Sequence, residues 1–323
     1  MPDILALGEP LVEFAATERG ALGEVRTFVR GFGGDTANFI LAAARLGGRP
    51  GYITRIGDDE FGRACQALWR REGVDTAGVI VEPGGVTGIY FIALDRDGRH
   101  TFTYYRAGSA ASHLQPADVD PAYLAQARLF HTSGITQAIS EGACAAAEAA
   151  MARARELGLI VTYDLNVRPR LRPVAELRGR VAAALRWAHV VFLSTEDAAH
   201  LFPDVAPEGV VERLVAQGPQ VVVLKRGPQG CLLITAEGER VAVPGWPVTP
   251  VDATGAGDAF DAAFVVERLR GRPLAEAACF ANAVGALTTT GLGATAAIPT
   301  RAAVEAFMGA PARDSHPEGG MGT

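Results

Sequence analysis

From residue 129 onward, short apolar runs alternate regularly with segments of helical spacing. The runs 129–132, 159–164, 190–193 and 220–224 are almost continuously apolar, and a helix-like stretch separates each run from the next. Strands that are apolar along their whole length are buried on both faces, so helices must cover both sides of their sheet. We therefore expect an α/β fold built on a doubly wound, mostly parallel sheet with helices on both faces.

A hairpin pattern interrupts this alternation near residue 90. Two strand-like segments, 87–94 and 99–106, flank the turn residues 95–98. A glycine-bearing turn between two such segments predicts a β-hairpin. In a chain that otherwise alternates strand and helix, this pair predicts a small β-sheet that stands off the main sheet.

The segment 251–264 carries the clearest signal for chemistry. Gly255 and Gly257 lead directly into Asp258, which is followed by an apolar run with helical spacing. A glycine-rich turn before a helix leaves backbone N–H groups unpaired at the positive end of the helix dipole, which favours an anion such as a phosphoryl group. Asp258 can then accept the proton of a hydroxyl brought to the same point.

A structural interpretation of this segment is also open. A Gly-x-Gly sequence before a helix is common in α/β proteins and can mark only a tight turn. The segment has neither the Lys-Ser/Thr of a nucleotide-binding P-loop nor the spacing of a dinucleotide fingerprint. The rest of the chain has to decide between the two interpretations.

Composition and charge exclude several classes of function. The 323 residues are 49% hydrophobic and 20% charged, which is typical of a globular protein with a sizeable core. A net charge of −6 provides no positive surface, so we expect no nucleic-acid and no membrane partner. No uncharged apolar run reaches the length of a membrane span, and we expect no signal peptide.

The cysteines predict a reducing environment. Cys65, Cys144, Cys231 and Cys279 lie far apart and form neither a Cys-x-x-Cys pair nor a Cys/His metal pattern. We therefore expect no disulfide framework and no zinc site, and we place the protein in the cytoplasm.

A second glycine cluster, at 31–34, precedes the helical segment 36–46. We expect Asp35 or Thr36 to cap this helix and Gly47 to end it in a left-handed conformation. The cluster is either a turn before a packed helix or a site that brings backbone and an amide to a polyol. The second interpretation rests on three residues: Gly33, Gly34 and Asn38.

Other polar residues are candidates for ligand binding. One group follows the predicted strands, where open α/β sheets bind ligands: Asn166, Arg168, Ser194, Asp197 and Lys225. On the hairpin, Tyr90, Tyr104 and Arg106 either cover a carboxylated substrate or form ordinary cross-strand contacts. Asn282 is either a buried amide or a nucleotide contact.

Several segments together resemble the ribokinase-like (PfkB) family of carbohydrate kinases. They occur in the expected order and spacing, as Gly-Phe-Gly-Gly-Asp-Thr-Ala-Asn at 31–38, Arg-Ile-Gly-Asp-Asp-Glu-Phe-Gly at 55–62, Leu-Lys-Arg-Gly at 224–227 and Asp-Ala-Thr-Gly-Ala-Gly-Asp at 252–258. Within that family the chain is most similar to 2-keto-3-deoxygluconate kinases. That similarity lies in residues 8–9, 33–36, 104–106, 131–135 and 166–171.

The resemblance implies a ribokinase-like domain over residues 1–310. A β lid, inserted at about 9–34 and 86–110, would close over the sugar and join subunits into a homo-oligomer. We expect a disordered tail at 311–323, which is rich in Pro, Gly and charge.

The resemblance also implies roles for individual residues. The sugar acid would contact Gly33, Gly34, Asn38, Tyr90, Tyr104, Arg106 and Arg168. ATP would contact Asn166, Ser194, Lys225, Gly227, Gly230, Gly255, Gly257 and Asn282. Asp258 would be the catalytic base, and the turn Gly255-Ala256-Gly257 would hold the phosphoryl group with Mg²⁺.

Two departures from the family pattern concern ions. Many relatives have Asn-x-x-Glu where this chain has Ser194-Thr195-Glu196-Asp197. Asp197 occupies the position of the Glu in that motif, and this position is the reason to expect it as a Mg²⁺ ligand. Ala253 replaces the usual Thr or Pro after Asp252, near which some relatives form a monovalent-cation site.

We therefore expect an ATP-dependent kinase that converts 2-keto-3-deoxygluconate to 2-keto-3-deoxy-6-phosphogluconate. A kinase for an acid needs cations near its substrate, and Arg106 and Arg168 supply them. The alternatives are a neutral-sugar kinase of the fructokinase or ribokinase type, a nucleoside kinase of the same fold, and a non-catalytic sugar or nucleotide sensor.

Overall fold

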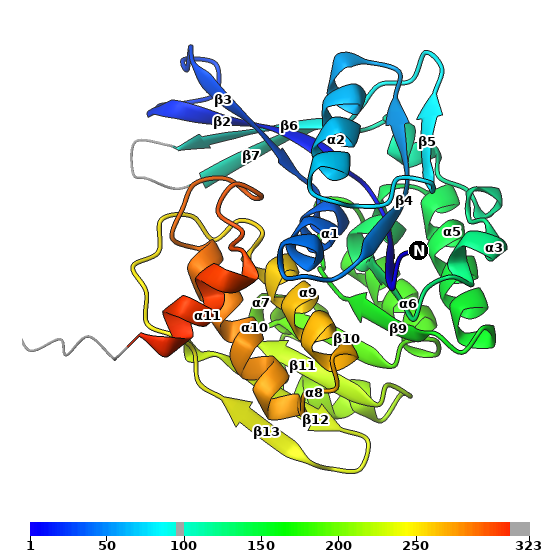
Figure 1. The fold of residues 1–323 in the computed structure, drawn as a ribbon, viewed down its shortest axis with the longest axis vertical. Helices are drawn as coiled ribbons and strands as arrows, with labels where there is room; N and C mark the ends of the chain where they lie inside the picture. Colours follow the sequence, from blue (N-terminus) through cyan, green and yellow to red (C-terminus); the bar gives the residue numbers. More distant parts are fainter. Residues whose placement is uncertain (95–99, 311–323) are drawn as a thin grey trace, which may run out of the picture.

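The structure is a computed structural model that describes residues 1–94 and 100–310. Its body is a large sheet flanked by helices, with a small sheet projecting from it (Figure 1). The predicted turn at 95–98 and the predicted tail at 311–323 lie outside the described residues.

The main sheet has nine strands in the order β13-β12-β11-β10-β9-β8-β1-β4-β5. Strands from β5 across to β11 pair in parallel, and only β12 and β13 at one edge run antiparallel. The strands are β1 (Ile4–Leu7), β4 (Pro50–Gly57), β5 (Val79–Glu82), β8 (Leu129–Ser133), β9 (Ile160–Asp164), β10 (Val190–Ser194), β11 (Val221–Lys225), β12 (Cys231–Thr235) and β13 (Arg240–Val243).

Helices cover both faces because the central strands are apolar on both. In β1, Ile4 and Ala6 pack into the core on one face, and Leu5 and Leu7 into the core on the other. The first face carries α1 (Asp35–Arg45), α2 (Glu60–Arg71), α9 (Ala256–Leu269), α10 (Leu274–Thr288) and α11 (Arg301–Gly309). The second carries α3 (Pro121–Leu124), α4 (Gly134–Ile139), α5 (Glu141–Glu156), α6 (Val174–Leu185), α7 (Thr195–Leu201) and α8 (Pro207–Val215).

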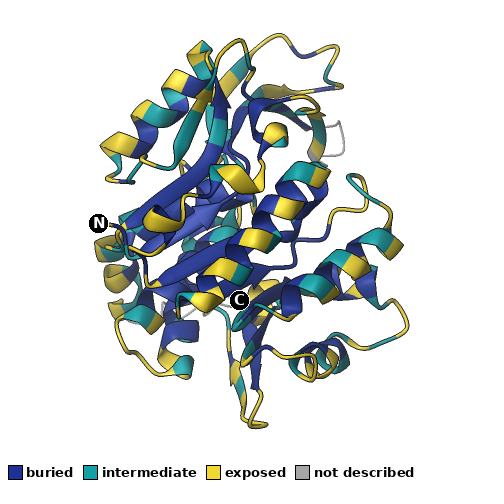
Figure 2. Ribbon diagram, turned by 90° about the vertical axis from the view of Figure 1, so that its right-hand side faces the viewer, coloured by how far each residue is buried: buried dark blue, intermediate teal, exposed yellow. Residues whose placement is uncertain are grey.

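Burial follows the same layers. Figure 2 shows the strands of the main sheet as almost entirely buried, with exposed residues on the outer sides of the helices. Short 3-10 helices complete the connections: η1 (Ala110–His113), η2 (Pro116–Asp118) and η3 (Gly227–Gln229).

The second, smaller sheet corresponds to the predicted lid and is called the lid below; its strands are β2 (Leu11–Arg19), β3 (Phe28–Gly33), β6 (Ile89–Leu94) and β7 (His100–Tyr105). Its order is β3-β2-β6-β7, with the predicted antiparallel pair β6–β7 at one side and a parallel pairing of β2 with β6 at its centre. Phe14 of the lid meets Phe61 of α2 edge to face, with ring centroids 5.6 Å apart. This contact is one of several between the lid and the body.

The start of α1 differs from the prediction that Asp35 or Thr36 caps it. The helix begins at Asp35, and the N-cap residue is Gly34 with a φ of 98° and no side-chain cap. A side chain at Gly34 would place its Cβ 2.2 Å from the carbonyl oxygen of Glu9, so only glycine fits there. Oδ1 of Asp35 accepts the Thr36 N–H at 2.8 Å, and Oδ2 serves the site described below. Gly47 does end the helix at a φ of 85°, as predicted.

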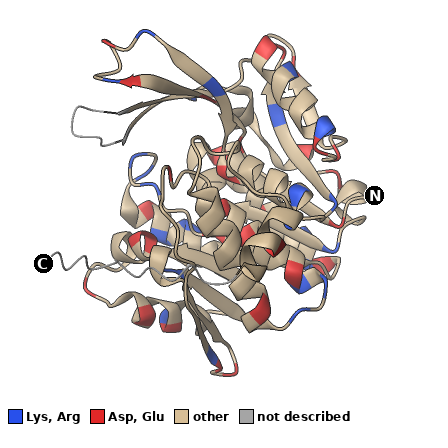
Figure 3. Ribbon diagram, turned by 60° about the vertical axis from the view of Figure 1, so that its left-hand side comes forward, with Lys and Arg blue, Asp and Glu red and all other residues tan. Residues whose placement is uncertain are grey.

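These observations confirm the predicted fold class, a doubly wound, mostly parallel α/β sheet with a small β lid. Charges of both signs are interspersed over the ribbon in Figure 3. Among the described residues, no helix combines the length and apolar character that crossing a membrane requires.

Candidate active site

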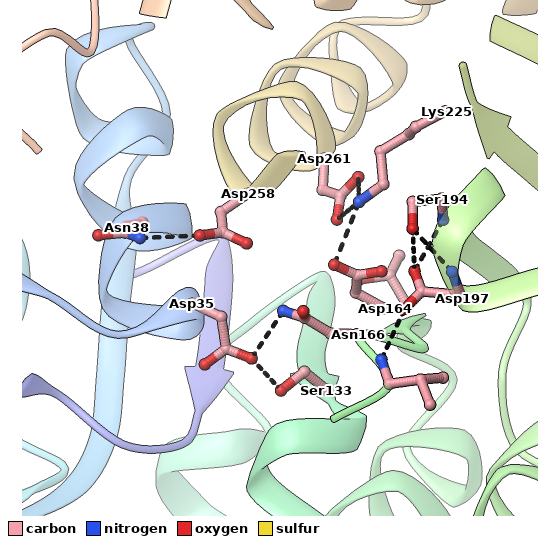
Figure 4. A network of polar contacts seen from close by, with 12 residues as sticks. Asp35, Asn38, Ser133, Asp164, Asn166, Ser194, Asp197, Lys225, Asp258 and Asp261 are labelled. Carbon is pink, nitrogen blue, oxygen red and sulfur yellow. Dashed lines mark hydrogen bonds and ion pairs between the residues drawn. The ribbon is translucent and has the colours of Figure 1, made fainter. Parts of the chain in front are cut away.

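Parallel strands that end together bring four polar side chains to one edge of the main sheet. In the strand register Ser133 of β8 lies beside Asp164 of β9, and Ser194 of β10 lies beside Lys225 of β11. The N-terminus of α9 lies at the same edge, so its residue Asp258 joins this row (Figure 4). This is the edge at which open α/β sheets bind ligands.

Lys225 is the centre of a buried charge cluster. Its Nζ donates to both carboxylate oxygens of Asp261, each at 3.0 Å, and to Oδ2 of Asp164 at 3.1 Å. Burial by itself would lower the pKa of the Lys225 ammonium, but the charges of these two carboxylates raise it above its usual value. For Asp261 the effect of burial has the opposite sign: burial raises the pKa of its carboxyl, and the charge of Lys225 opposes that shift. The ammonium group is therefore held protonated.

Asp258 lies beside this cluster and is bound from the opposite helix. Nδ2 of Asn38 in α1 donates to Oδ2 of Asp258 in α9 at 2.8 Å. Asn38 is only 4% exposed, and its Oδ1 is buried without a hydrogen-bond partner. A buried carbonyl oxygen without a partner marks a place for a hydrogen-bond donor.

The surroundings of Asp258 make it a stronger base than an exposed carboxylate. Loss of water around the carboxyl is the largest cause that raises the pKa of Asp258 to about 8, and the negative charge of Asp35 adds to it. The hydrogen bond from Asn38 and the charge of Lys225 lower the same pKa. The net result is a carboxyl group that exchanges a proton near neutral pH.

The start of α9 provides hydrogen-bond donors next to Asp258. Gly255 is the N-cap at a φ of 78°, and a side chain there would place its Cβ 2.5 Å from the Ala294 carbonyl oxygen. The first i→i−4 bond of the helix runs from the Ala259 N–H to the Gly255 carbonyl. The N–H groups of Gly257 and Asp258 precede that bond, at the positive end of the helix. Ala256, expected to contribute a third donor, instead bonds the Ala253 carbonyl at 3.2 Å.

Asp35 anchors a second polar cluster on the other side of Asp258. Its Oδ2 accepts hydrogen bonds from the Ser133 hydroxyl and, at 3.3 Å, from Nδ2 of Asn166. Asn166 has a φ of 38°, and it is the only described non-glycine residue in the left-handed region. This uncommon backbone turns the Asn166 amide back toward the strand ends.

The lid residues Tyr90 and Tyr104 stack with ring centroids 5.5 Å apart. The Tyr90 hydroxyl donates to Glu13, whose carboxylate also accepts the Ala294 N–H at 3.4 Å. Gly33 is required beside them, because a Cβ there would lie 2.5 Å from the Tyr90 hydroxyl. The predicted substrate residues Gly33, Tyr90 and Tyr104 are thus together, although the Tyr90 hydroxyl already has a partner.

The charges of three arginines act on Tyr104, the more exposed tyrosine of this stack. Tyr104 is 43% exposed, and burial of the remainder raises the pKa of its hydroxyl. Three cations oppose that shift: Arg106, Arg168 and Arg170. Arg106 is paired with the buried carboxylate of Glu9, whereas Arg168 is exposed and donates to the Val167 carbonyl at 3.0 Å.

The predicted nucleotide residues divide into two groups. Lys225 and Ser194 lie at the strand ends. Gly230 and Asn282 lie against the end of β13, because a Cβ at Gly230 would be 2.1 Å from the Val243 carbonyl and the Asn282 amide donates to that same carbonyl at 3.3 Å. Gly227, at a φ of 56°, begins η3 just after β11.

Asp197, the predicted metal ligand, is engaged within the protein. Its Oδ1 accepts the Val167 N–H at 2.7 Å, and its Oδ2 accepts the N–H and hydroxyl of Ser194 at 2.8 and 2.7 Å. Ser194 bonds back to the Asp197 N–H, so the two form a capping box at the start of α7.

Comparison with known proteins assigns the chain to a family. A sequence model described as "pfkB family carbohydrate kinase" matches residues 1–301. The chain belongs to the PfkB family of carbohydrate kinases. It is therefore a phosphotransferase that uses a hydroxyl group as acceptor, which confirms the family prediction.

Individual relatives differ in their acceptors. This PfkB kinase is 36% identical to Fructokinase-1 of Oryza sativa subsp. japonica, over 94% of this chain and 97% of the relative. It is 35% identical to 2-dehydro-3-deoxygluconokinase of Thermoproteus tenax, over 95% of this chain and 94% of the relative. An Escherichia coli structure described as Ribokinase II in complex with ATP and Mg²⁺ superimposes with a TM-score of 0.88 at 28% identity, over 95% of this chain and 99% of that one.

Sequence patterns did not single out several carboxylates of this PfkB kinase. Asp261 follows Asp258 by three residues and appears in the sequence as part of an apolar helix, yet it bonds Lys225. Asp164 is the last residue of a predicted strand, and that position alone does not mark a carboxylate as functional. Asp35 was predicted to be a helix cap. The only sequence signal for Asp164 and Asp261 is a charged residue in an otherwise apolar element, which requires a partner.

The charge cluster predicts a stability that depends on pH. Lys225→Met leaves Asp164 and Asp261 buried without a counter-charge, and we expect it to cost roughly 3–5 kcal/mol at pH 8. Without the cation, burial raises the pKa of Asp261 in the folded state further, so the loss grows as pH rises above the unfolded value of that carboxyl and shrinks toward pH 5.

Thermal unfolding at both pH values measures this effect. Arg240→Met is the matched control, because its ion pair with Glu212 at 2.7 Å is half-exposed and should contribute no more than about 1 kcal/mol. A Lys225→Met protein as stable as the control at pH 8 would contradict the cluster's role.

Proposed function

We propose that this PfkB kinase transfers the terminal phosphoryl group of ATP to the 6-hydroxyl of 2-keto-3-deoxygluconate. The product is 2-keto-3-deoxy-6-phosphogluconate. The observation that carries the proposal is a set of arginine charges at Tyr104: the Arg106 guanidinium lies over the Tyr104 ring at 5.4 Å, and the charges of Arg168 and Arg170 also act on its hydroxyl.

A charge balance at this set favours an acidic acceptor. Glu9 offsets the charge of Arg106, and the exposed Arg168 and Arg170 remain beside the lid. Guanidinium groups bind carboxylates in a planar, two-point geometry, so a sugar acid gains from these cations and a neutral sugar does not.

The reaction proceeds by proton transfer to Asp258. The acceptor hydroxyl gives its proton to the Asp258 carboxylate as its oxygen bonds the γ-phosphorus, and the bond from that phosphorus to the ADP oxygen breaks. Asn38 holds the other carboxylate oxygen at 2.8 Å, which orients the base. The N–H groups of Gly257 and Asp258 stabilise the charge that develops on the phosphoryl oxygens.

Lys225 adds a fixed positive charge behind these donors. A Cβ built on Gly257 would lie 3.4 Å from the Lys225 Nζ, so the ammonium group lies just beneath the turn. We assign it to stabilising the transferred phosphoryl group, while Asp164 and Asp261 keep it protonated and in place.

The residues present fit ATP with Mg²⁺. Within residues 1–94 and 100–310, no group of three or more His, Cys, Asp or Glu side chains could hold a metal ion. Mg²⁺ commonly uses one or two carboxylates, water and substrate phosphates, and it would neutralise phosphate charge here. Oδ1 of Asp164 is buried without a hydrogen-bond partner and is better suited to hold the ion's water than Asp197, whose two oxygens are engaged.

Three further expectations remain proposals. We place the protein in the cytoplasm, in keeping with its four free cysteines. We propose a homo-oligomer formed through the lid, whose edge strands expose Val29 and Tyr105; a monomer in sedimentation at micromolar concentration would contradict it. A monovalent cation near Asp252 would appear as stimulation of activity by K⁺.

The second candidate is a neutral-sugar kinase. Glu9 already offsets the charge of Arg106, and the identity to rice Fructokinase-1 is as high as that to the Thermoproteus tenax enzyme. An ADP-release assay with 2-keto-3-deoxygluconate, fructose, ribose and adenosine decides between the candidates. Highest kcat/KM for the acid supports the proposal, and preference for fructose overturns it. Binding without turnover of any of them would favour a sensor.

Asp258→Asn tests the base. The amide keeps the size of the side chain but accepts no proton, so we expect kcat to fall by about 10²- to 10⁴-fold. Thermal unfolding and ATP binding should stay close to wild type. Near-normal turnover would remove Asp258 from the reaction.

Arg168→Ala tests the carboxylate contact. Loss of a charge-assisted hydrogen bond should raise KM for the keto acid about 10-fold or more and leave KM for ATP within about twofold. Arg172→Ala is the matched control from the same loop, because its guanidinium bonds the Ala138 carbonyl and Glu141 instead. Equal changes in the two KM values, or equal behaviour of both variants, would contradict the assignment.

A further inference from the structure

A buried ion pair lies where the lid joins the main sheet. Glu9 lies between β1 and β2, where the chain enters the lid. Arg106 directly follows β7, the last strand of the lid, where the chain leaves it. Nη2 of Arg106 donates to Oε2 of Glu9, and the two side chains are only 11% and 1% exposed. The pair thus connects both ends of the lid at its base.

One side of the Arg106 guanidinium is satisfied and another is not. Oε2 of Glu9 accepts a hydrogen bond from Nη2 of Arg106, and Oε1 of Glu9 accepts one from the Ser109 hydroxyl at 3.3 Å. Nε of Arg106 is buried and has no hydrogen-bond partner, although the group lies over the Tyr104 ring at 5.4 Å. A buried, unpaired N–H of a charged group is costly, so it marks a place for an acceptor atom.

The charge of Glu9 acts on residues that we place around the acceptor. Burial is the largest cause that raises the pKa of the Tyr104 hydroxyl, and the charge of Glu9 adds to it against the three arginines. Burial also raises the pKa of Glu9, which the charge of Arg106 opposes and the negative charge of Asp35 reinforces. The backbone carbonyl of Glu9 lies against Gly34, before α1 and Asn38. A full charge in this buried position acts through a medium that screens it less than water does.

We propose that Glu9 is a specificity-determining residue: by neutralising Arg106 it sets the net charge that faces the acceptor. Arg106 then contributes a hydrogen-bond donor, its Nε–H, while the uncompensated charge that selects an acid comes from Arg168 and Arg170. This inference rests on the proposed function only in placing the acceptor beside the lid. It does not require that the acceptor be 2-keto-3-deoxygluconate.

A purely structural pair makes a different prediction. If Glu9 and Arg106 only held the lid, their replacement would change binding of acid and neutral acceptors alike. If they set charge, the ratio of kcat/KM for an acid to kcat/KM for a neutral sugar would follow the net charge of the pair.

A double-mutant cycle separates these cases. The proteins are wild type, Glu9→Gln, Arg106→Gln and the double variant, each full length and assayed at pH 8, which favours the ionised Glu9. The acceptors are 2-keto-3-deoxygluconate and fructose. If one acceptor is phosphorylated too slowly for kcat/KM to be measured, its inhibition constant against phosphorylation of the other acceptor is measured in place of kcat/KM.

We expect the acid-to-neutral ratio to rise about fivefold or more in Glu9→Gln and to fall by a similar factor in Arg106→Gln. The double variant should return close to the wild-type ratio, even if both rates are lower, because its pair is again neutral. Glu13→Gln is the matched control, a buried lid carboxylate that bonds Tyr90 rather than an arginine, and it should not raise the ratio.

Two results would overturn the proposal. One is an unchanged ratio in both single variants that retain wild-type unfolding temperatures. The other is a double variant that keeps the low ratio of Arg106→Gln, which would mean that Arg106 itself binds the carboxylate. Preference of wild type for fructose would refute the proposed substrate but leave this test of Glu9 intact.

Discussion

The hydrogen bond from Asn38 to Asp258 is the contact on which the account depends. It joins α1 to α9 at 2.8 Å across 220 residues of sequence, and it fixes the carboxylate that we assign as the base. Both helices lie on the same face of the main sheet, so packing of that face sets the position of the contact. The lid, the turn at Gly255 and the strand ends are all arranged around this point.

The charges around Asp258 act against one another. Loss of water and the charge of Asp35 raise its pKa to about 8, and Asn38 and Lys225 lower it. A carboxyl group in that range binds and releases a proton near neutral pH, as a general base must. Lys225 can serve the phosphoryl group only because Asp164 and Asp261 offset the cost of burying its charge.

The sequence was sufficient for the architecture and for part of the site. Continuous apolar strands predicted the parallel sheet, and the turn before Asp258 predicted a helix start, because both are local patterns. Asp261 and Glu9 could not be predicted, since their partners are 36 and 97 residues away and only the fold brings them together. Asp35 or Thr36 was expected to cap the helix because both residue types suit a cap, whereas the N-cap is Gly34, and Oδ2 of Asp35 bonds Ser133 and Asn166 instead.

A crystal structure of the protein with its acceptor and a non-hydrolysable ATP analogue tests the central claim most directly. The account predicts the reacting hydroxyl oxygen about 2.6 to 3.2 Å from one Asp258 carboxylate oxygen, with Asn38 still donating to the other. The γ-phosphate should then lie against the N–H groups of Gly257 and Asp258. An acceptor bound with every hydroxyl out of reach of Asp258, with the lid closed over it, would contradict the account.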